Sequence, residues 1–429
     1  MTTVEQSIND AQQRSWTAIG ENRISPSFYW DADTFESELD LIFRTWWIYV
    51  GHTSEVPTPN SYCRKRVAGQ ELVLTRDESG EVGVFFNRCS HRGNLVCMQP
   101  SGQTRALRCA YHGWAFGLDG ALRAVPRPDA YGDRIAEMRQ RLGLSRPADT
   151  QSYGGFVFCR LEDDPTAPCF DEFIEPVRPS IDRLLSLSPQ REVQLTGGWI
   201  GHRLHCNWKM VVESNVDNYH VNFVHKSLLD ALPGSFDSAE DLTVRHLGMG
   251  HTEVDFRPQY RRDGRPLIWS GAVPYDKLGD YVPSMTERYG AQETDRILID
   301  GPPHTMIFPN LFLSQMNIMI IDPVSAEESV AFTTPIFMAG ADKLNRRTAL
   351  QCSGAMGPAG LIIADDAEIG DRNQVALHTV KPEWLDITRG LERQSDDGVV
   401  QESAWGGDET PQRGIWTAYR RAMTRRGKS

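Results

Sequence analysis

Hydrophobic residues have a helical spacing near the start of the chain and a strand-like pattern after it. Between Asp33 and Trp47, apolar side chains recur every three or four positions, at Phe35, Leu39, Ile42, Phe43 and Trp46. This spacing predicts an amphipathic helix. From Ile48 the apolar residues form short runs, such as 71–75 and 81–86, separated by Gly, Asp, Asn and Pro. Such runs predict short strands, so we expect a small β domain after an N-terminal helical segment.

The remainder of the chain has a mixed pattern and predicts a second, larger domain of the α+β class. Residues 256–300 are charged and interrupted by Pro and Gly, which is typical of loops over a pocket or of a solvated insertion. The apolar stretches 305–313, 315–322 and 329–338 predict strands. At the end, Gly414 to Met423 has amphipathic spacing and is followed by a basic tail. This favours a packed helix with a solvated end over a membrane-binding helix.

Composition and charge exclude several classes of protein. The 429 residues carry a formal net charge of −12, which argues against nucleic acid as a partner. Eight Cys residues are too few for a disulfide scaffold at this length, so we expect a reduced, cytoplasmic protein. The N-terminus lacks the pattern of a signal peptide, and no apolar run approaches the ~20 residues that cross a bilayer. We therefore expect no membrane association.

Two short Cys and His motifs in the predicted β domain indicate a metal centre. Cys89-Ser-His91 is followed, after seventeen residues, by Cys109-Ala-Tyr-His112. A structural zinc site usually takes two Cys from one segment and two His from another. The mixed pairing favours a Rieske-type [2Fe–2S] cluster, in which two Cys bind one iron and two His bind the other. A zinc ribbon, or Cys and His without a metal, is the alternative.

A second group of metal-binding residue types lies in the stretch 213–225. Asp217 precedes His220 by three residues, one helical turn, so the two are expected to share a helix face, and His225 follows five residues later. Two imidazoles and a carboxylate suit the facial triad of non-haem Fe(II), which leaves coordination positions open for O2. A helix with one core His and one surface His is the alternative. The upstream Cys and His motifs favour iron.

In this order, the motifs resemble the large (α) subunits of Rieske non-haem iron ring-hydroxylating oxygenases. The resemblance begins near Trp46-Trp47-Ile-Tyr-Val-Gly-His and resumes at Asn207-Trp208-Lys209. It implies a Rieske [2Fe–2S] domain over residues 46–165 and a catalytic domain over residues 166–429. The catalytic domain is expected to have a helix-grip fold, an antiparallel sheet with helices. Residues 1–45 are expected to pack on it as a helical segment.

The resemblance also assigns iron ligands. The two Cys and two His of the upstream motifs become the cluster ligands, and His220 and His225 become ligands of the mononuclear Fe(II). The third ligand becomes Asp366, in the stretch Gly357-Pro-Ala-Gly360-Leu-Ile-Ile-Ala-Asp365-Asp366-Ala-Glu368. In that stretch Asp365 is expected to cap a helix or to support a ligand, and Glu368 is a weaker competitor.

Partners follow from the same resemblance. Asp217 becomes the catalytic carboxylate that connects His112 of one chain to His220 of the next, so we expect a ring of three α subunits, with or without three β subunits. The chain has no Gly-x-Gly-x-x-Gly motif after a strand and no further ferredoxin-type Cys cluster. NADH is therefore expected to bind a separate reductase, which delivers electrons directly or through a ferredoxin.

We therefore expect the oxygenase component of a multicomponent dioxygenase that uses O2 and NADH-derived electrons to hydroxylate an aromatic compound. The sequence is similar in texture to benzoate- and salicylate-type subunits, which favours an aromatic acid and leaves a neutral arene or a diaryl ether open. An aromatic acid would need an Arg, and only Arg245 and Arg257 are candidates, because strands 305–340 have none. A Rieske monooxygenase or demethylase with a non-aromatic substrate, and an electron carrier without catalysis, are the alternatives.

Other residues receive simpler interpretations. Side chains expected to line the pocket, or to be plain core, are Phe223, Val224, Phe312, Asn317, Met319 and Ile362. Six further His residues are expected to be structural, because the metal ligands are already assigned. They are His202, His205, His246, His251, His304 and His378.

Overall fold

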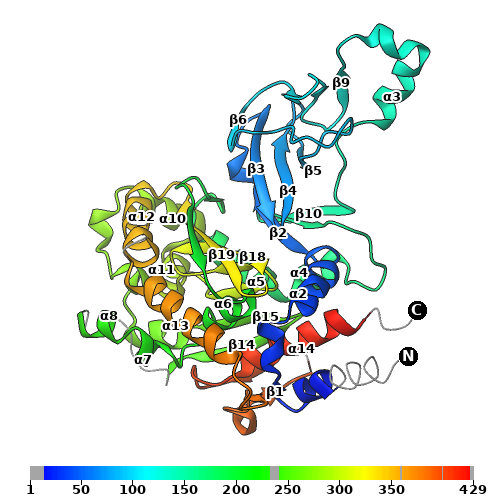
Figure 1. The fold of residues 1–429 in the computed structure, drawn as a ribbon. Coiled ribbons are helices and arrows are strands. Elements are labelled where there is room, and N and C mark those ends of the chain that lie inside the picture. The colour runs from blue at the N-terminus through cyan, green and yellow to red at the C-terminus, as the bar shows by residue number, and fades with distance from the viewer. Residues whose placement is uncertain (1–13, 232–240, 358–359, 399, 426–429) are drawn as a thin grey trace, which may run out of the picture. The chain divides into compact units, whose positions relative to one another are not determined.

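The computed structural model describes residues 14–231, 241–357, 360–398 and 400–425. It forms two compact units. The smaller takes in Phe43–Pro165 and Gln194–Thr196, and the larger takes in the chain before residue 43, Thr166–Val193 and the chain from Gly197. Helices and antiparallel sheets make up both (Figure 1), as the predicted α+β class requires. No helix in the described ranges has the length and apolarity needed to cross a membrane. Residues 1–13 of the expected N-terminal segment lie outside these ranges.

The smaller unit is built from three antiparallel sheets. The first has the order β5-β4-β3-β6, formed by β3 (Ser61–Val67), β4 (Gln70–Arg76), β5 (Val82–Phe86) and β6 (Ser101–Gln103). The second contains β7 (Leu107–Arg108), β8 (Ala115–Phe116) and β9 (Leu122–Ala124). The third pairs β10 (Asp149–Tyr153) and β11 (Phe156–Arg160) with β2 (Ile48–His52). The apolar runs 71–75 and 81–86 correspond to β4 and β5, whose Val73 and Phe85 are in the unit's core.

A nine-stranded antiparallel sheet is the centre of the larger unit. Its order is β13-β19-β18-β17-β16-β15-β14-β23-β22. The strands are β13 (Ile200–Leu204), β14 (Thr243–Gly248), β15 (His251–Asp255), β16 (Thr305–Ile307), β17 (Leu311–Leu313), β18 (Asn317–Ser325), β19 (Glu328–Pro335), β22 (Ser395–Asp396) and β23 (Gln401–Ser403). The predicted strand 305–313 is in fact a hairpin, because β16 and β17 pair with each other.

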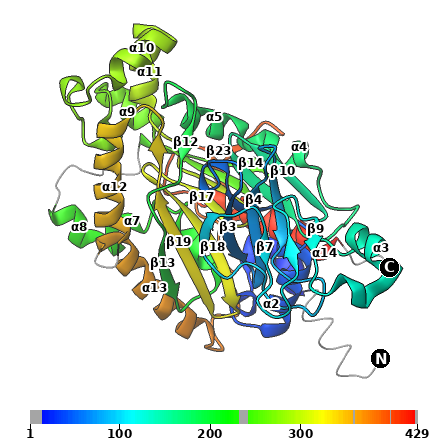
Figure 2. The same ribbon diagram turned by 90° about the horizontal axis from the view of Figure 1, so that it is seen from above.

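Helices cover this sheet. The last helix, α14 (Thr410–Thr424), contacts β14 and β15, and most of its residues are buried (Figure 1). This confirms a packed helix, although residues 426–429 of the basic tail lie outside the described residues. On the other side of the unit, α12 (Asp342–Met356) contacts β19, and α13 (Leu361–Leu377) contacts β13 and α6 (Trp208–Ser214) (Figure 2).

Most of the stretch 256–300 is helical, so the predicted loops were wrong there, and residues 264–280 form turns and irregular backbone with two short 3-10 segments. It forms α9 (Arg257–Asp263), α10 (Tyr281–Tyr289) and α11 (Ala291–Asp300), joined by shorter turns. Pro258 lies in the first turn of α9, where its missing N–H costs nothing, and Gly264 ends the helix with a φ of +73°. The same Pro and Gly residues that suggested loops are therefore helix boundaries.

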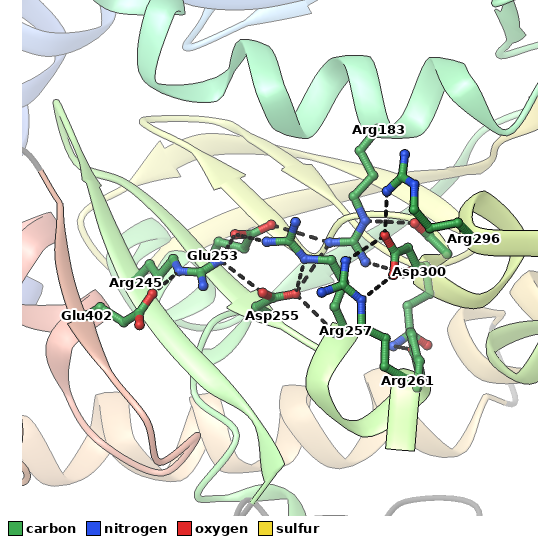
Figure 3. Close-up of polar contacts among 12 residues, drawn as sticks. Arg183, Arg245, Glu253, Asp255, Arg257, Arg261, Arg296, Asp300 and Glu402 are labelled. Atoms are coloured by element: carbon green, nitrogen blue, oxygen red, sulfur yellow. Dashed lines mark hydrogen bonds and ion pairs between the residues drawn. The ribbon is translucent and has the colours of Figure 1, made fainter. Parts of the chain in front are cut away.

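An ion-pair network attaches these helices to the sheet (Figure 3). Arg245 of β14 and Arg257 of α9 both pair with Asp255 of β15, at 2.9 Å and 2.8 Å. Arg261 of α9 pairs with Asp300 of α11 at 2.6 Å. Arg245 and Arg257, the two candidates for binding a substrate carboxylate, are thus occupied by protein carboxylates.

Helix formation near the N-terminus ends earlier than predicted. Helix α2 (Ala32–Glu38) begins after Asp31, whose side chain accepts from Thr34 N at 2.7 Å, and it continues into a π turn over Leu39–Phe43. Its last residue, Glu38, is fully buried. That carboxylate accepts hydrogen bonds from three buried donors, Trp208 Nε1, Lys209 Nζ and Tyr419 Oη. The network fixes α6, which leads into the stretch 213–225.

Candidate metal centres and substrate cavity

Two loops of the smaller unit bring the expected cluster ligands together. Cys89 and His91 follow β5, and Cys109 and His112 lie between β7 and β8. Both Cys side chains are buried in one apolar cluster. The rings of His91 and His112 lie 4.7 Å apart, measured between centroids. The four side chains therefore lie close together, and each of the two loops provides one Cys and one His.

The two loops have the same backbone geometry. Gly93 N donates to Cys89 O at 2.9 Å, and Gly113 N donates to Cys109 O at 2.9 Å. Both glycines have a positive φ, 75° and 73°, which a side chain would strain. A glycine four residues after each Cys therefore closes the turn that presents the His between them.

Hydrogen-bond donors surround the sulfur of Cys109. Burial raises the pKa of this thiol, but donors from the Tyr111 amide, the Asn94 side chain and the His112 amide outweigh burial, and the pKa is lowered. The Asn94 Nδ2 atom lies 3.8 Å from Cys109 Sγ. Burial prevails at Cys89, where the pKa is raised. Donors of this kind stabilise a thiolate and tune a cluster bound to it.

The imidazole of His91 has a nitrogen with no protein partner. Its Nδ1 atom is buried and takes part in no hydrogen bond in the described structure. The ring stacks on Trp114 with 4.6 Å between centroids and an angle of 5°. A buried nitrogen held rigidly beside two thiols, with no protein partner, has the surroundings of a metal ligand.

The larger unit brings His220, His225 and Asp366 together. His220 and His225 flank the short helix α7 (Val221–Val224), and Asp366 comes from α13. One potential ligand atom from each lies within 4.8 Å of the other two. The Nε2 atoms of His220 and His225 lie 3.6 Å and 3.3 Å from the same oxygen, Asp366 Oδ1.

Each of the two imidazoles has a second carboxylate at its other nitrogen. Asp217 Oδ2 lies 3.4 Å from His220 Nδ1, and Asp365 Oδ2 lies 3.4 Å from His225 Nδ1. The chain between α6 and α7 is not helical, so the predicted shared helix face of Asp217 and His220 is wrong. The two residues meet across a turn instead. Glu368 is exposed and pairs with Arg372.

The carboxylates of Asp217, Asp365 and Asp366 make the electrostatic potential at this site negative. Burial lowers the pKa of His220, but hydrogen bonds to Asp217 and Asp366 outweigh burial and raise the pKa to about 9. Burial raises the pKa of Asp366, but hydrogen bonds from His220 and His225 reverse the effect and lower it. The carboxylate is therefore ionised at neutral pH, as the ligand of a cation must be.

Comparisons with protein families agree with this geometry. Residues 46–142 match the Rieske [2Fe-2S] domain, and residues 191–425 match the ring hydroxylating alpha subunit (catalytic domain). The second match alone spans more than half of the chain. The chain belongs to the ring-hydroxylating α-subunit family. It is therefore an oxidoreductase with a Rieske [2Fe–2S] domain and a catalytic domain of a mononuclear iron family.

Individual relatives cover most of this α subunit. It is 34% identical to the toluate 1,2-dioxygenase subunit alpha of Pseudomonas putida, over 81% of this chain and 78% of that protein. It is 26% identical to the anthranilate 1,2-dioxygenase large subunit of Acinetobacter baylyi, over 90% of this chain and 83% of that protein. The crystal structure of naphthalene 1,2-dioxygenase from Rhodococcus sp. bound to indole superimposes with a TM-score of 0.81 at 21% identity, and the match covers 96% of this chain and 97% of that chain. That structural match shows a common fold.

Two cavities adjoin the three-residue cluster of the α subunit. The smaller, about 140 Å³, is lined by His220, His225 and Asp366 together. The larger, about 520 Å³, is lined by His220 and Asp366 but not by His225. Only the smaller of the two therefore has access to all three residues, and we treat it as the candidate substrate cavity.

Sequence reasoning located some of the cavity walls. Phe312, Asn317 and Ile362 line the candidate substrate cavity, whereas Val224 and Met319 line the larger one. Phe223 is 69% exposed and lines neither. The wall residues that were missed include Phe256 and His304. The ring of Phe256 lies in a stretch interpreted as loop, and His304 was interpreted as structural because the metal ligands were already assigned.

Two of the other His residues have the structural roles that the sequence suggested. The His251 ring bonds through Nε2 to Phe173 O at 2.8 Å and accepts from Phe308 N at 3.1 Å. His202 bonds through Nε2 to Met356 O at 2.7 Å. His304 differs from both, because its ring borders the candidate substrate cavity.

Proposed function

We propose that the protein is the oxygenase component of a multicomponent system that hydroxylates an aromatic compound with O2. One observation carries this proposal. His220, His225 and Asp366, from segments far apart in the sequence, converge on one cavity that also has the aromatic walls Phe256 and Phe312. An electron carrier without catalysis would need no such cavity.

The donor atoms fit the metals of this family. We assign Cys89 and Cys109 to one iron of the [2Fe–2S] cluster and His91 and His112 to the other, since these residues provide two buried sulfurs and two neighbouring rings. We assign the Nε2 atoms of His220 and His225 and a carboxylate oxygen of Asp366 to the mononuclear Fe(II). When bound, this iron supplies the binding and reduction of O2 with electrons from the cluster.

Carboxylates behind the imidazoles orient the ligands. Asp217 and Asp365 each lie 3.4 Å from the Nδ1 atom of a His ligand, and accepting from Nδ1–H leaves Nε2 unprotonated toward the metal. Asp217 also accepts from the amide of Tyr219 at 2.9 Å, and Arg389 lies 3.7 Å from it. Its position is therefore set independently of His220. We propose that it also connects His220 to the cluster ligand His112 of a neighbouring chain, in a ring of three α subunits.

The further partners are those of a multicomponent system. We propose that NADH-derived electrons come from a separate reductase, directly or through a ferredoxin, and that β subunits can complete an α3β3 hexamer. The names of the toluate and anthranilate relatives support an aromatic acid. The side chains around the cavity argue against an aromatic acid, because no Arg or Lys is among the described residues that line the cavity. We therefore propose an aromatic compound without requiring an acid group.

Anaerobic reconstitution with iron and sulfide tests the proposal. We expect a rhombic Rieske EPR signal after reduction and one further Fe(II) per chain. The additional iron should be lost in His220→Ala, whereas the Rieske signal should remain. Zinc in the Cys and His loops, or a Rieske signal without the additional iron, would contradict the oxygenase assignment.

A further inference from the structure

His304 and Asn317 lie on one face of the central sheet, two strands apart. Thr305 pairs with Leu313, and Leu313 pairs with Ile318, so the preceding residues His304 and Asn317 are at the same end of β16 and β18. Alternation along the strands and pairing across them place both on the face that carries Phe312. Phe312, on the strand between them, contacts the His304 ring edge-to-face at 4.7 Å. Neighbouring strands are about 4.8 Å apart, so the backbones of the two residues, two strands apart, are separated by about 9.6 Å.

Both side chains have a buried polar atom without a partner. In the part of the chain that the structure describes, His304 Nδ1 and Asn317 Nδ2 make no hydrogen bond, and both residues line the candidate substrate cavity. Asn317 is 2% exposed. Buried polar atoms are almost always hydrogen-bonded, so two in one cavity wall indicate a polar ligand.

The hydrogen bond on the opposite side of the ring determines what His304 offers. Its Nε2 atom lies 3.0 Å from the carbonyl oxygen of Asn215. A carbonyl only accepts, so Nε2 carries the proton and Nδ1 has the free lone pair. Burial lowers the pKa of His304 to about 4 and outweighs the hydrogen bond to Asn215, which raises the pKa. The ring is therefore neutral at pH 7, and the unpartnered Nδ1 of this cavity-lining residue is an acceptor.

Charge in the cavity argues against an anionic ligand. Its charged lining residues, within the described ranges, are the carboxylates Asp217 and Asp366 and the histidines beside them. The Arg245 and Arg257 side chains are paired with Asp255, outside this lining. A carboxylate beside the His304 acceptor would find no Arg or Lys side chain among these lining residues and would meet a lone pair.

We infer that His304 and Asn317 select a neutral aromatic substrate with a hydroxyl or amino group. The O–H or N–H of the ligand donates to His304 Nδ1, and the Asn317 amide donates to an oxygen or nitrogen of the ligand. Both are specificity-determining residues rather than ligands of the iron. The inference deepens the proposed oxygenase function and rests on it for the identity of the cavity.

Calorimetric titration of the anaerobic, oxidised holoprotein tests this without turnover. The probes are phenol, aniline, anisole, toluene and benzoate, which are similar in size and differ in charge and donor. We expect phenol and aniline to bind about tenfold more tightly than anisole, which has no donor for Nδ1. Benzoate should bind more weakly than toluene. Benzoate binding more tightly than phenol, or equal binding of phenol and anisole, would overturn the inference.

Variants locate the effect. His304→Phe keeps the ring and removes the acceptor, so the phenol preference over anisole should fall to about onefold. His251→Phe is the matched control, because His251 is also a buried ring in this sheet but does not line the cavity. It should keep the preference. Asn317→Leu, which is close in shape to Asn, removes the donor to an oxygen that phenol and anisole share, so it should weaken both of them relative to toluene. It provides a second test if either His variant does not fold. An unchanged phenol preference over anisole in His304→Phe, together with unchanged binding of phenol and anisole relative to toluene in Asn317→Leu, would refute the assignment.

Failure of this inference is distinguishable from failure of the proposed function. Metal analysis and EPR of the same sample report the mononuclear iron and the cluster. Equal binding of all probes with both metals present would remove the role of His304 and leave the oxygenase function. A missing mononuclear iron would remove the oxygenase function, whatever the probes show.

Discussion

The buried ion pair between Lys209 and Glu38 leads to a quantitative prediction. The Lys209 and Glu38 side chains are 2% and 0% exposed. Removal of the ammonium in Lys209→Met would leave the Glu38 carboxylate buried with only the neutral donors Trp208 and Tyr419. Breaking one side of a buried pair typically costs about 3–5 kcal/mol. We therefore expect Lys209→Met to lower the free energy of unfolding by that amount.

Neutralising both partners should recover part of the loss. In the double variant Lys209→Met with Glu38→Gln, no buried charge remains, and the Gln oxygen still accepts from Trp208 or Tyr419. We expect the double variant to be about 2 kcal/mol more stable than Lys209→Met alone. Lys226→Met is the control, because Lys226 pairs with Asp230 on the surface, where both side chains are more than 60% exposed. Its effect should be below about 1 kcal/mol.

Urea unfolding followed by tryptophan fluorescence measures these differences, provided that the slope of the transition is unchanged. Two results would refute the reasoning. One is a Lys209→Met variant within about 1 kcal/mol of the wild type. The other is a double variant no more stable than Lys209→Met, which would mean that lost packing rather than an unpaired charge causes the loss.

Three further predictions concern the site. Burial raises the pKa of Glu213 to about 7 despite a hydrogen bond from Tyr29. The folded state therefore holds this proton more tightly than the unfolded state, and the contribution to stability is full below about pH 4.5 and is lost as the pH rises to about 7. The loss is roughly 3 kcal/mol and should be absent in Glu213→Gln, so the unfolding free energies of wild type and variant, measured by urea unfolding at several pH values, should diverge by that amount; parallel pH profiles would contradict it. Asp365→Asn should weaken mononuclear iron binding by about 10- to 100-fold, because His225 loses a negatively charged acceptor; a chelator competition measures this, and an unchanged affinity would show that Asp365 has no such role. Asp217→Asn should keep both metals, checked by EPR and iron analysis, and largely abolish product formation; normal turnover would exclude its proposed role.

The sequence predicts the local chemistry well and the long-range geometry poorly. The Cys and His motifs are short, and a glycine after each fixes its turn, so the smaller unit's ligand loops could be read directly. Asp366 lies far along the chain from His220, and no periodicity connects them. Only the family resemblance pointed to it, and the structure now places its carboxylate between the two imidazoles.

Other errors have a physical cause as well. The Pro and Gly residues in 256–300 mark helix boundaries as readily as loops, and composition alone does not separate the two. The role inferred for His304 depends on which of its nitrogens is already bonded, and that is decided by the carbonyl of Asn215, which is distant in sequence. Phe223 was expected in a cavity wall because it lies beside ligands, yet the short α7 turns it outward.

The side chains around the candidate substrate cavity come from two sources. The expected iron ligands flank α7 or lie on α13, whereas His304, Phe312 and Asn317 lie on or beside the interior strands β16, β17 and β18 of the central sheet. Substitutions in the strands can therefore change which molecule is accepted without moving a ligand. Natural variation can explore new growth substrates at little risk to the metal centre, and an engineer can randomise these three positions as one library.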